Sequence, residues 1–190
     1  MQFLRQNIFL ALWVAWLSCW LVAAFGTKRT LRHESLGSRL AHVVPLMVGV
    51  WLIANPNPPL GALDRRVIPG SLATYWSLAA LTAAGLLFTV WARVHLGRNW
   101  SGTVSVKDEH TLITSGPYAA VRHPIYTGLL AAILGSALAV GNWRGLIGFL
   151  VSCAALWRKL RVEENWMEQT FGDAYVAYKS RVRALIPFIL

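Results

Sequence analysis

Long apolar runs separated by short polar segments dominate the sequence. They predict five membrane-spanning helices over residues 7–25, 40–54, 71–92, 125–140 and 143–157, since a crossing takes about 20 apolar residues. The second run is short and contains Pro45, so we expect that helix to be kinked or extended by its flanks. The prolines within residues 55–59 end it, because proline cannot continue a helix. The pattern therefore indicates an all-α integral membrane protein.

The last two apolar runs are joined only by Gly141 and Asn142, which predicts a tight antiparallel helical hairpin. Small residues recur every three or four positions on both arms, and such faces let helices approach closely in lipid. We expect the two arms to pack on each other through these faces. The small residues are Gly128, Ala132, Gly135 and Ala139 on the first arm and Gly145, Gly148 and Ser152 on the second.

The polar remainder completes a single membrane domain over residues 1–190. Residues 1–92 supply three helices, and residues 93–190 supply a polar loop (93–124), the hairpin and a charged, amphipathic tail (158–190). Fourteen of the 18 Lys and Arg residues fall in the tail, the polar loop and residues 28–39. Because positive loops stay in the cytoplasm, we expect these segments and the carboxyl terminus to face it, with the amino terminus outside.

Composition and charge agree with a multi-pass protein of the cytoplasmic or inner membrane. Hydrophobic residues make up 56% of the chain and charged residues 14%, against about 45–50% and about 25% in soluble domains. This hydrophobicity excludes disorder. The net charge of +10 is typical of cationic loops beside anionic lipid. Because no nucleic-acid-binding motif accompanies the charge, we do not expect a nucleic-acid partner.

The segment Arg122-His123-Pro124-Ile125-Tyr126 is one candidate for chemistry. Pro124 suits the first turn of a helix, because its missing N–H would be unsatisfied there anyway. Arg122 and His123 then precede the helix, and we expect their backbone amides to be exposed at its positive end. Such a site could take an anionic or carbonyl group. The alternative is a basic interface anchor at an ordinary helix start, and the residues alone do not decide between the two.

The acidic pair Glu163-Glu164 is the other candidate, and it follows the last span. Lys159 precedes Glu163 by four residues, so the two share a helix face. The pair is either a solvated face or a counter-charge for a cation. About 40 residues separate it from Arg122, but both lie beside the hairpin and can meet in space. The histidine spacing matches no metal-ligand pattern, so no metal site is predicted.

Several pieces occur in order along residues 97–190, and together they resemble the isoprenylcysteine carboxyl methyltransferase family of integral membrane methyltransferases. They are the run His110–Tyr118, the run Arg122–Tyr126, the small-residue hairpin, Glu163-Glu164 and the spacing Phe171-Gly172-x-x-Tyr175-x-x-Tyr178. The resemblance implies S-adenosylmethionine as methyl donor, in a pocket made by the loop, the hairpin start and the following helix. The implied donor-lining residues are His110, Leu112, Ile113, Tyr118, His123, Pro124, Ile125, Tyr126, Glu163 and Glu164.

The resemblance also implies roles on the acceptor side. Lys159 stands where the eukaryotic enzymes carry a substrate-contacting Arg, and a lysine cannot grip a carboxylate with two parallel hydrogen bonds. The candidate catalytic residues are His123 and Arg122. His123 is the first base to test if the acceptor must lose a proton. Arg122 either pairs with the donor carboxylate or holds the loop.

We expect methyl transfer to a carboxylate of a lipidic or small amphiphilic acceptor that arrives from the bilayer. A phospholipid amine and a small thiol remain alternatives for the acceptor. A sterol-reductase-like oxidoreductase that uses NADPH is a further alternative, because those enzymes share a similar carboxyl-terminal layout. A non-catalytic membrane scaffold is the last. It predicts tolerance of changes at His123 and Glu163.

Overall fold

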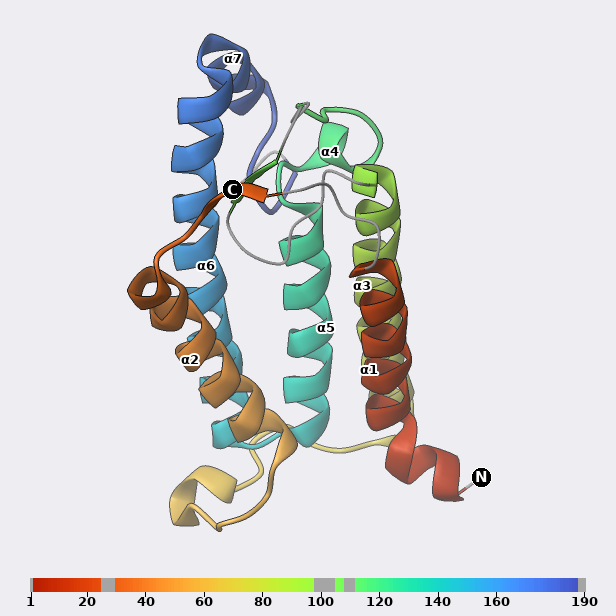
Figure 1. Ribbon diagram of the computed structural model, residues 1–190. Helices are drawn as coiled ribbons and strands as arrows, with labels where there is room; N and C mark the ends of the chain where they lie inside the picture. Colours follow the sequence, from red (N-terminus) through yellow and green to blue (C-terminus); the bar gives the residue numbers. More distant parts are fainter. Residues whose placement is uncertain (1, 25–29, 98–104, 108–111, 188–190) are drawn as a thin grey trace.

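The computed structural model describes residues 2–24, 30–97, 105–107 and 112–187. Its long helices run alternately up and down the bundle in chain order (Figure 1). They are α1 (Gln2–Ala24), α2 (Leu36–Ala54), α3 (Leu72–Leu96), α5 (Pro124–Val140) and α6 (Trp143–Phe171). The shorter elements are β1 (Thr30–His33), η1 (Gly61–Asp64), β2 (Ser105–Lys107), α4 (Pro117–Ala120) and α7 (Asp173–Arg181).

The helical architecture predicted from the apolar runs is confirmed, and α2 begins earlier than predicted. Ser35 caps this helix, because its side chain accepts a hydrogen bond from the Ser38 amide at 3.3 Å. Pro45 lies inside α2 without ending it. Two of the helices, α2 and α3, are long and apolar enough to cross a membrane, and the apolar segments Asn7–Ala23 and Pro124–Val140 are shorter. The number of crossings, five, stays a prediction.

A small two-stranded sheet adds to the predicted helices. Strands β1 and β2 pair antiparallel, with Thr30 opposite Lys107 and His33 opposite Ser105. Neither segment shows an apolar period, so the sequence pattern did not mark them. The pairing gives hydrogen-bond partners to backbone N–H and C=O groups that would otherwise bond to water.

Helix α6 is longer than the predicted span that ends at Trp157. It continues without a break to Phe171 and ends at Gly172, which has a positive φ of 53°. The first part of the predicted tail is therefore helix, because no Gly or Pro interrupts residues 149–171. The acidic pair consequently lies on the same rigid element as the apolar segment.

The predicted turn between α5 and α6 is confirmed. Gly141 adopts the left-handed conformation (φ 71°), and the Asn142 side chain accepts a hydrogen bond from the Gly145 amide at 2.9 Å. The prediction that the small faces of the two arms pack on each other holds beside the turn, where a Cβ on Gly145 would lie 3.0 Å from the Ala137 oxygen of α5, and was wrong further along the arms. A Cβ on Gly128 would lie 2.5 Å from the Gly85 oxygen in α3, and one on Gly148 would lie 2.5 Å from the Gly49 oxygen in α2.

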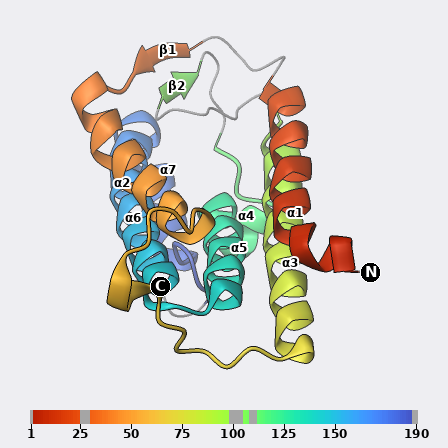
Figure 2. The same ribbon diagram turned by 90° about the horizontal axis from the view of Figure 1, so that it is seen from below.

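The two small faces thus each receive a different partner. Helix α5 packs on α3, α6 packs on α2, and α5 lies between α6 and α3 (Figure 2). A stripe of small residues marks where a helix approaches closely, but not which helix approaches. Helix α1 covers α3, and the Trp16 indole donates a hydrogen bond to Thr89 Oγ1 at 2.7 Å.

The apolar core lies at the end of the bundle that carries α4 and α7. It joins the first part of α5, the middle of α6 and the segment after α7. Its buried members are Tyr126, Ile133, Leu156, Leu160, Ala184 and Leu185. This core fixes the start of α5 against the part of α6 that carries the acidic pair.

Candidate functional site

The segment after α7 is hydrogen-bonded to the start of α5. The amide of Arg122 donates to the Arg183 oxygen at 2.8 Å, and the amide of His123 donates to the Ala184 oxygen at 3.0 Å. The Thr127 hydroxyl donates to the Leu185 oxygen at 2.7 Å. Our expectation of free amides at Arg122 and His123 was therefore wrong, because the tail of the chain takes both donors. A ligand at this helix start therefore cannot use these two amides.

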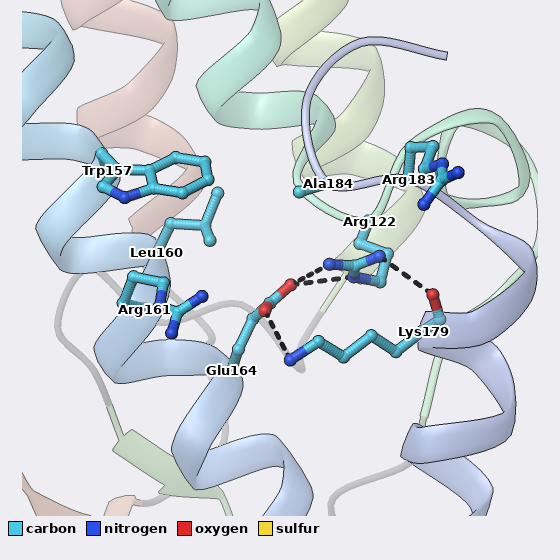
Figure 3. Close-up of a pocket in the computed structure, with 8 residues that line it drawn as sticks. All are labelled: Arg122, Trp157, Leu160, Arg161, Glu164, Lys179, Arg183 and Ala184. Carbon is cyan, nitrogen blue, oxygen red and sulfur yellow. Dashed lines mark hydrogen bonds and ion pairs between the residues drawn. The ribbon is translucent and has the colours of Figure 1, made fainter. Parts of the chain in front are cut away.

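Glu164 is buried and accepts several charged hydrogen bonds (Figure 3). Arg122 contacts Glu164 Oε1 through Nε at 2.8 Å and through Nη2, and Lys179 Nζ lies 3.1 Å from Oε2. Burial raises the pKa of the Glu164 carboxyl, but the interactions with His123, Arg122 and Lys179 outweigh burial and lower it to about 2. Glu164 is thus ionised and fully occupied by the protein's own cations.

Arg122 also fixes the tail of the chain. Its Nη1 donates to the carbonyl oxygens of Lys179, at 3.3 Å, and Val182. The guanidinium therefore ties the α4–α5 connection to α6 and to the end of α7. This set of contacts corresponds to the loop-holding alternative for Arg122.

Glu163 points to a different set of partners from its neighbour. The Tyr126 hydroxyl donates to Glu163 Oε1 at 2.5 Å, and His123 Nδ1 lies 3.7 Å from Oε2. The His123 and Tyr126 rings stack with their centroids 5.5 Å apart and 7° between their planes. The Glu163 side chain is 25% exposed against 4% for Glu164. Of the two acids, Glu163 is the one that a ligand can reach.

His123 stands between the two carboxylates. Its Nε2 lies 3.4 Å from Glu164 Oε1, but the geometry is outside that of a hydrogen bond. Among the residues that the structure describes, this buried nitrogen has no hydrogen-bond partner. A buried polar atom without a partner is uncommon, and it is often found where a ligand binds.

Lys159 lies on the same side as Glu163. Its Nζ is 4.0 Å from Glu163 Oε1 and 5.4 Å from the centroid of the Tyr126 ring. The ion pair is longer than a hydrogen bond, and Nζ donates no hydrogen bond within the described parts of the chain. The N–H groups of this ammonium are therefore available to bind another anion.

Of the other predicted donor-lining residues, Tyr118 lies near the same site. Burial, and after it the negative charge of Glu163, raises the pKa of the Tyr118 hydroxyl. The Tyr178 hydroxyl donates to the Tyr118 carbonyl oxygen at 2.5 Å and holds the residue in place. Leu112 and Ile113 are half-buried, and His110 lies outside the described residues.

Pro124 and Ile125 have a supporting place. Pro124 is buried at the first position of α5, and Ile125 packs against the apolar core. Both therefore set the direction in which α5 leaves the connection and carries Tyr126.

A second polar group near Lys159 was missed by the sequence reasoning. Arg158 donates to the Ser38 oxygen at 2.8 Å and to Ser38 Oγ at 3.2 Å, and Ser38 donates to Glu34 Oε1 at 2.5 Å. His42 Nδ1 lies 3.7 Å from Glu34 Oε1. An acid before one apolar run and a base after another was the available signal, but their pairing depends on α2 lying against α6.

Comparison with known proteins agrees with this arrangement. A family model described as Phospholipid methyltransferase matches residues 73–174, which include the start of α5 and the acidic pair. A probable protein-S-isoprenylcysteine O-methyltransferase of Oryza sativa subsp. indica is 27% identical over 187 residues, which cover 92% of this chain and 96% of the rice protein. The protein-S-isoprenylcysteine O-methyltransferase of Schizosaccharomyces pombe is 35% identical over 104 residues, which cover 52% of this chain and 43% of that protein.

A solved structure shares the fold. It is that of the eukaryotic intramembrane Ras methyltransferase, isoprenylcysteine carboxyl methyltransferase, with a TM-score of 0.56 and 22% sequence identity. The match covers 84% of this chain and 55% of the solved chain, so this protein spans about half the length of that relative. The resemblance drawn from the sequence motifs is confirmed.

Proposed function

Because the chain belongs to the phospholipid methyltransferase family, and is thereby a methyltransferase with S-adenosylmethionine as its methyl donor, we propose that it methylates the carboxylate of a lipidic or small amphiphilic acceptor. The relatives named protein-S-isoprenylcysteine O-methyltransferase support an oxygen acceptor. The observation in this chain that carries the proposal is the ammonium group of Lys159, which has no hydrogen bond among the described residues and lies beside Glu163 and Tyr126.

The residues around His123 fit the proposed donor. S-adenosylmethionine supplies an electrophilic methyl group on a sulfonium cation. The Glu163 carboxylate and the Tyr126 ring suit a cation, and the buried Nε2 of His123 offers an unused polar contact. We assign donor contacts to Glu163, Tyr126, His123 and Tyr118, with Leu112, Ile113 and His110 on the loop side. Glu164 holds Arg122 and Lys179 instead, because these cations already occupy both of its oxygens.

The acceptor carboxylate is held by Lys159 in this proposal. An ionised carboxylate oxygen would attack the methyl carbon with its own lone pair while the methyl–sulfur bond breaks and S-adenosylhomocysteine leaves, so no proton has to be removed. The protein then contributes positioning and exclusion of water. Lys159 orients the carboxylate through its ammonium group, and the Tyr126 ring beside it limits the approach of solvent. Arg122 contributes by fixing the connection that carries His123.

An amine or thiol acceptor makes a different demand on the site. Either group has to lose a proton, and His123 is then the base, with its Nδ1 3.7 Å from Glu163 Oε2. The rate of methyl transfer in His123→Gln therefore distinguishes the acceptors. An amine or thiol acceptor predicts a large loss of this rate, because the base is removed. A carboxylate acceptor predicts that, at saturating donor, this variant keeps a rate close to that of the wild type, since no proton has to be removed.

We further propose that α1, α2, α3, α5 and the first part of α6 cross the membrane. In this placement the end of the bundle that carries Glu163, Glu164 and α7 faces the cytoplasm. Figure 1 places this end opposite the connection between α2 and α3, which carries Arg65 and Arg66. A membrane-impermeant thiol reagent applied to intact cells tests the orientation. It is expected to label Arg66→Cys and to leave Arg181→Cys unlabelled, in a chain with both native cysteines replaced.

Calorimetric titration of the detergent-purified protein with S-adenosylhomocysteine tests the donor site. NADPH is the control ligand, and Glu168→Gln, on the exposed part of α6, is the control variant. We expect binding of S-adenosylhomocysteine alone, weakened about tenfold or more by Glu163→Gln, since a hydrogen bond to a charged group contributes about 1.5–3 kcal/mol. Binding of NADPH instead would support the reductase alternative. Binding of neither ligand to folded protein would favour the scaffold.

Acceptor identity is tested once donor binding is established. Candidate acceptors are an S-prenylated cysteine with a free carboxylate, phosphatidylethanolamine and an alkyl thiol, each supplied with labelled donor. A carboxylate acceptor gives a methyl ester, which releases methanol in base, whereas N-methyl and S-methyl products do not. Transfer only to the amine or only to the thiol would overturn the proposed acceptor and leave the methyltransferase assignment intact.

A further inference from the structure

A cavity of about 200 Å³ lies on α6 next to Glu164, between this helix, α7 and the segment that follows α7 (Figure 3). Its walls carry four cations, Arg122, Arg161, Lys179 and Arg183, and one carboxylate, Glu164. Neither Glu163, Tyr126 nor Lys159 lines it. The cavity is thus a basic groove beside the proposed donor and acceptor site and outside it.

Two of the four cations in the groove, Arg161 and Arg183, are not paired with other side chains of the described residues. Arg122 and Lys179 are engaged by Glu164, and Lys179 also by Glu168 at 2.8 Å. The guanidinium groups of Arg161 and Arg183 form neither a hydrogen bond nor an ion pair with any residue that the structure describes, and both residues are exposed. Figure 3 shows Arg161 on α6 and Arg183 on the opposite wall. Both guanidinium groups are therefore available to an anion between the walls.

The apolar part of the groove continues the outer face of α6. Trp157 and Leu160 line the groove, and Arg161 follows Trp157 by one helical turn. Leu150 and Trp157 are two turns apart on this helix, and they are 63% and 42% exposed. In the proposed membrane placement, the exposed apolar stripe of α6 ends here, and Arg161 is the first cation on this face of the helix. Tryptophan is enriched at this depth, where lipid headgroups begin.

We propose that this groove binds the phosphate group of an anionic membrane lipid, with Arg161 and Arg183 as its donors. A guanidinium group presents a planar fork that matches phosphate oxygens, and two forks from opposite walls can hold one phosphate. The exposed Trp157 side chain offers apolar contact for the part of the lipid below its headgroup, which free phosphate lacks. The inference rests on the membrane placement given under the proposed function, but not on the acceptor.

The position of the groove gives the bound lipid a structural consequence. The Arg183 carbonyl oxygen accepts a hydrogen bond from the Arg122 amide, and the Ala184 carbonyl oxygen accepts one from the His123 amide. A phosphate that bridges Arg161 and Arg183 therefore links α6 to the segment that holds the start of α5. An anionic lipid in the groove would stabilise the arrangement of His123 without contact with donor or acceptor.

The test compares two double variants of the full chain in neutral detergent. Arg161→Gln/Arg183→Gln removes both groove donors, and Arg39→Gln/Arg181→Gln removes two exposed arginines elsewhere. Native mass spectrometry measures binding of phosphatidylglycerol, phosphatidylcholine and inorganic phosphate to each. We expect one phosphatidylglycerol to bind the wild type and the control alike and the groove variant about thirty-fold more weakly, taking about 1 kcal/mol for each cation.

Other outcomes contradict the proposal. Equal losses in both double variants would mean diffuse attraction between a positive protein and an anionic lipid. Phosphate binding as strong as phosphatidylglycerol binding would assign the groove to a soluble anion. Titration with S-adenosylhomocysteine shows whether the groove variant is folded. Arg161→Lys/Arg183→Lys keeps both charges without the forks, and full retention of lipid affinity by this variant would overturn the role of the guanidinium groups.

Discussion

The Tyr126 hydroxyl donates a hydrogen bond to the Glu163 carboxylate, with 2.5 Å between the two oxygens, although 37 residues separate them in the sequence. The bond joins the first turn of α5 to the cytoplasmic extension of α6 in the proposed placement. It also orients the one acid of the pair that a ligand can reach. The proposed donor site therefore depends on how these two helices are held together.

Substitution of Tyr126 separates the roles of its hydroxyl and its ring. Tyr126→Phe leaves Glu163 without a charge-assisted hydrogen bond, so we expect about tenfold or greater loss of S-adenosylhomocysteine affinity. Tyr126→Ala also removes the ring stacked on His123 and should lose more. Calorimetric titration measures both. Equal losses would assign the whole effect to the hydroxyl, and unchanged affinity in both variants would exclude Tyr126 from the donor site.

Lys179 pairs with two acids of very different burial, which provides a matched test of the ion-pair network. Glu164 is 4% exposed, and Glu168 is 38% exposed. Glu164→Gln leaves the buried Arg122 charge without its partner, so we expect a loss of about 3–5 kcal/mol in the free energy of unfolding. Glu168→Gln removes a surface pair and should cost less than about 1 kcal/mol. Denaturant unfolding in detergent measures both, and similar losses would argue against a buried network.

Acid should destabilise the protein through Glu164. Its pKa is about 2 in the folded protein against an ordinary value of 4.5. Because the folded pKa is the lower one, the unfolded chain takes up the proton first as pH falls. The stabilisation is present in full above about pH 4.5 and is lost as pH falls towards 2. The melting temperature of the wild type should fall over this window, and Glu164→Gln should show a flatter profile.

The approach of α5 to α3 should be sensitive to a single methyl group. A Cβ at position 128 would lie 2.5 Å from the Gly85 oxygen and 2.6 Å from Thr89 Cγ2. We expect Gly128→Ala to destabilise the protein by about 1–3 kcal/mol through overpacking. At Gly37, in the first turn of α2, nothing lies within 4 Å of the added atom, so Gly37→Ala should be neutral or slightly stabilising. A thermal shift assay on both variants checks the difference.

The sequence predicted the elements of this fold better than their partners. Apolar periodicity located the long helices, and the Gly141-Asn142 turn was predicted from its length alone. The pairing of Gly128 with Gly85 and of Gly148 with Gly49 could not be predicted, because a small residue permits close approach by any helix. The sequence placed Lys159 and Glu163 on a helix, but the continuity of this helix with the last span was missed, because the charges after Trp157 were taken to separate the span from the tail.

The residues of the candidate site were predicted as a set, but the different roles of residues within it were not. The motifs brought His123, Tyr126 and Glu163 together, and the structure places them in contact. The separation of Glu163 from Glu164 depends on which side of α6 meets Arg122, and neighbouring acids look alike in a sequence. The capture of the Arg122 and His123 amides depends on a segment about 60 residues later, with no pattern that links the two.

The uninterrupted course of α6 from Trp143 to Phe171 has a mechanical consequence. At 1.5 Å per residue it is a rod of about 43 Å, and in the proposed placement its apolar end lies in the bilayer and Glu163 on the part outside it. A helix responds to a thinner or thicker bilayer by tilting, and a rod that tilts at one end displaces the other. Glu163 would then shift relative to Tyr126 on α5. The rate of methyl transfer should therefore depend on the acyl-chain length of the surrounding lipid, so that the thickness of the membrane regulates the enzyme.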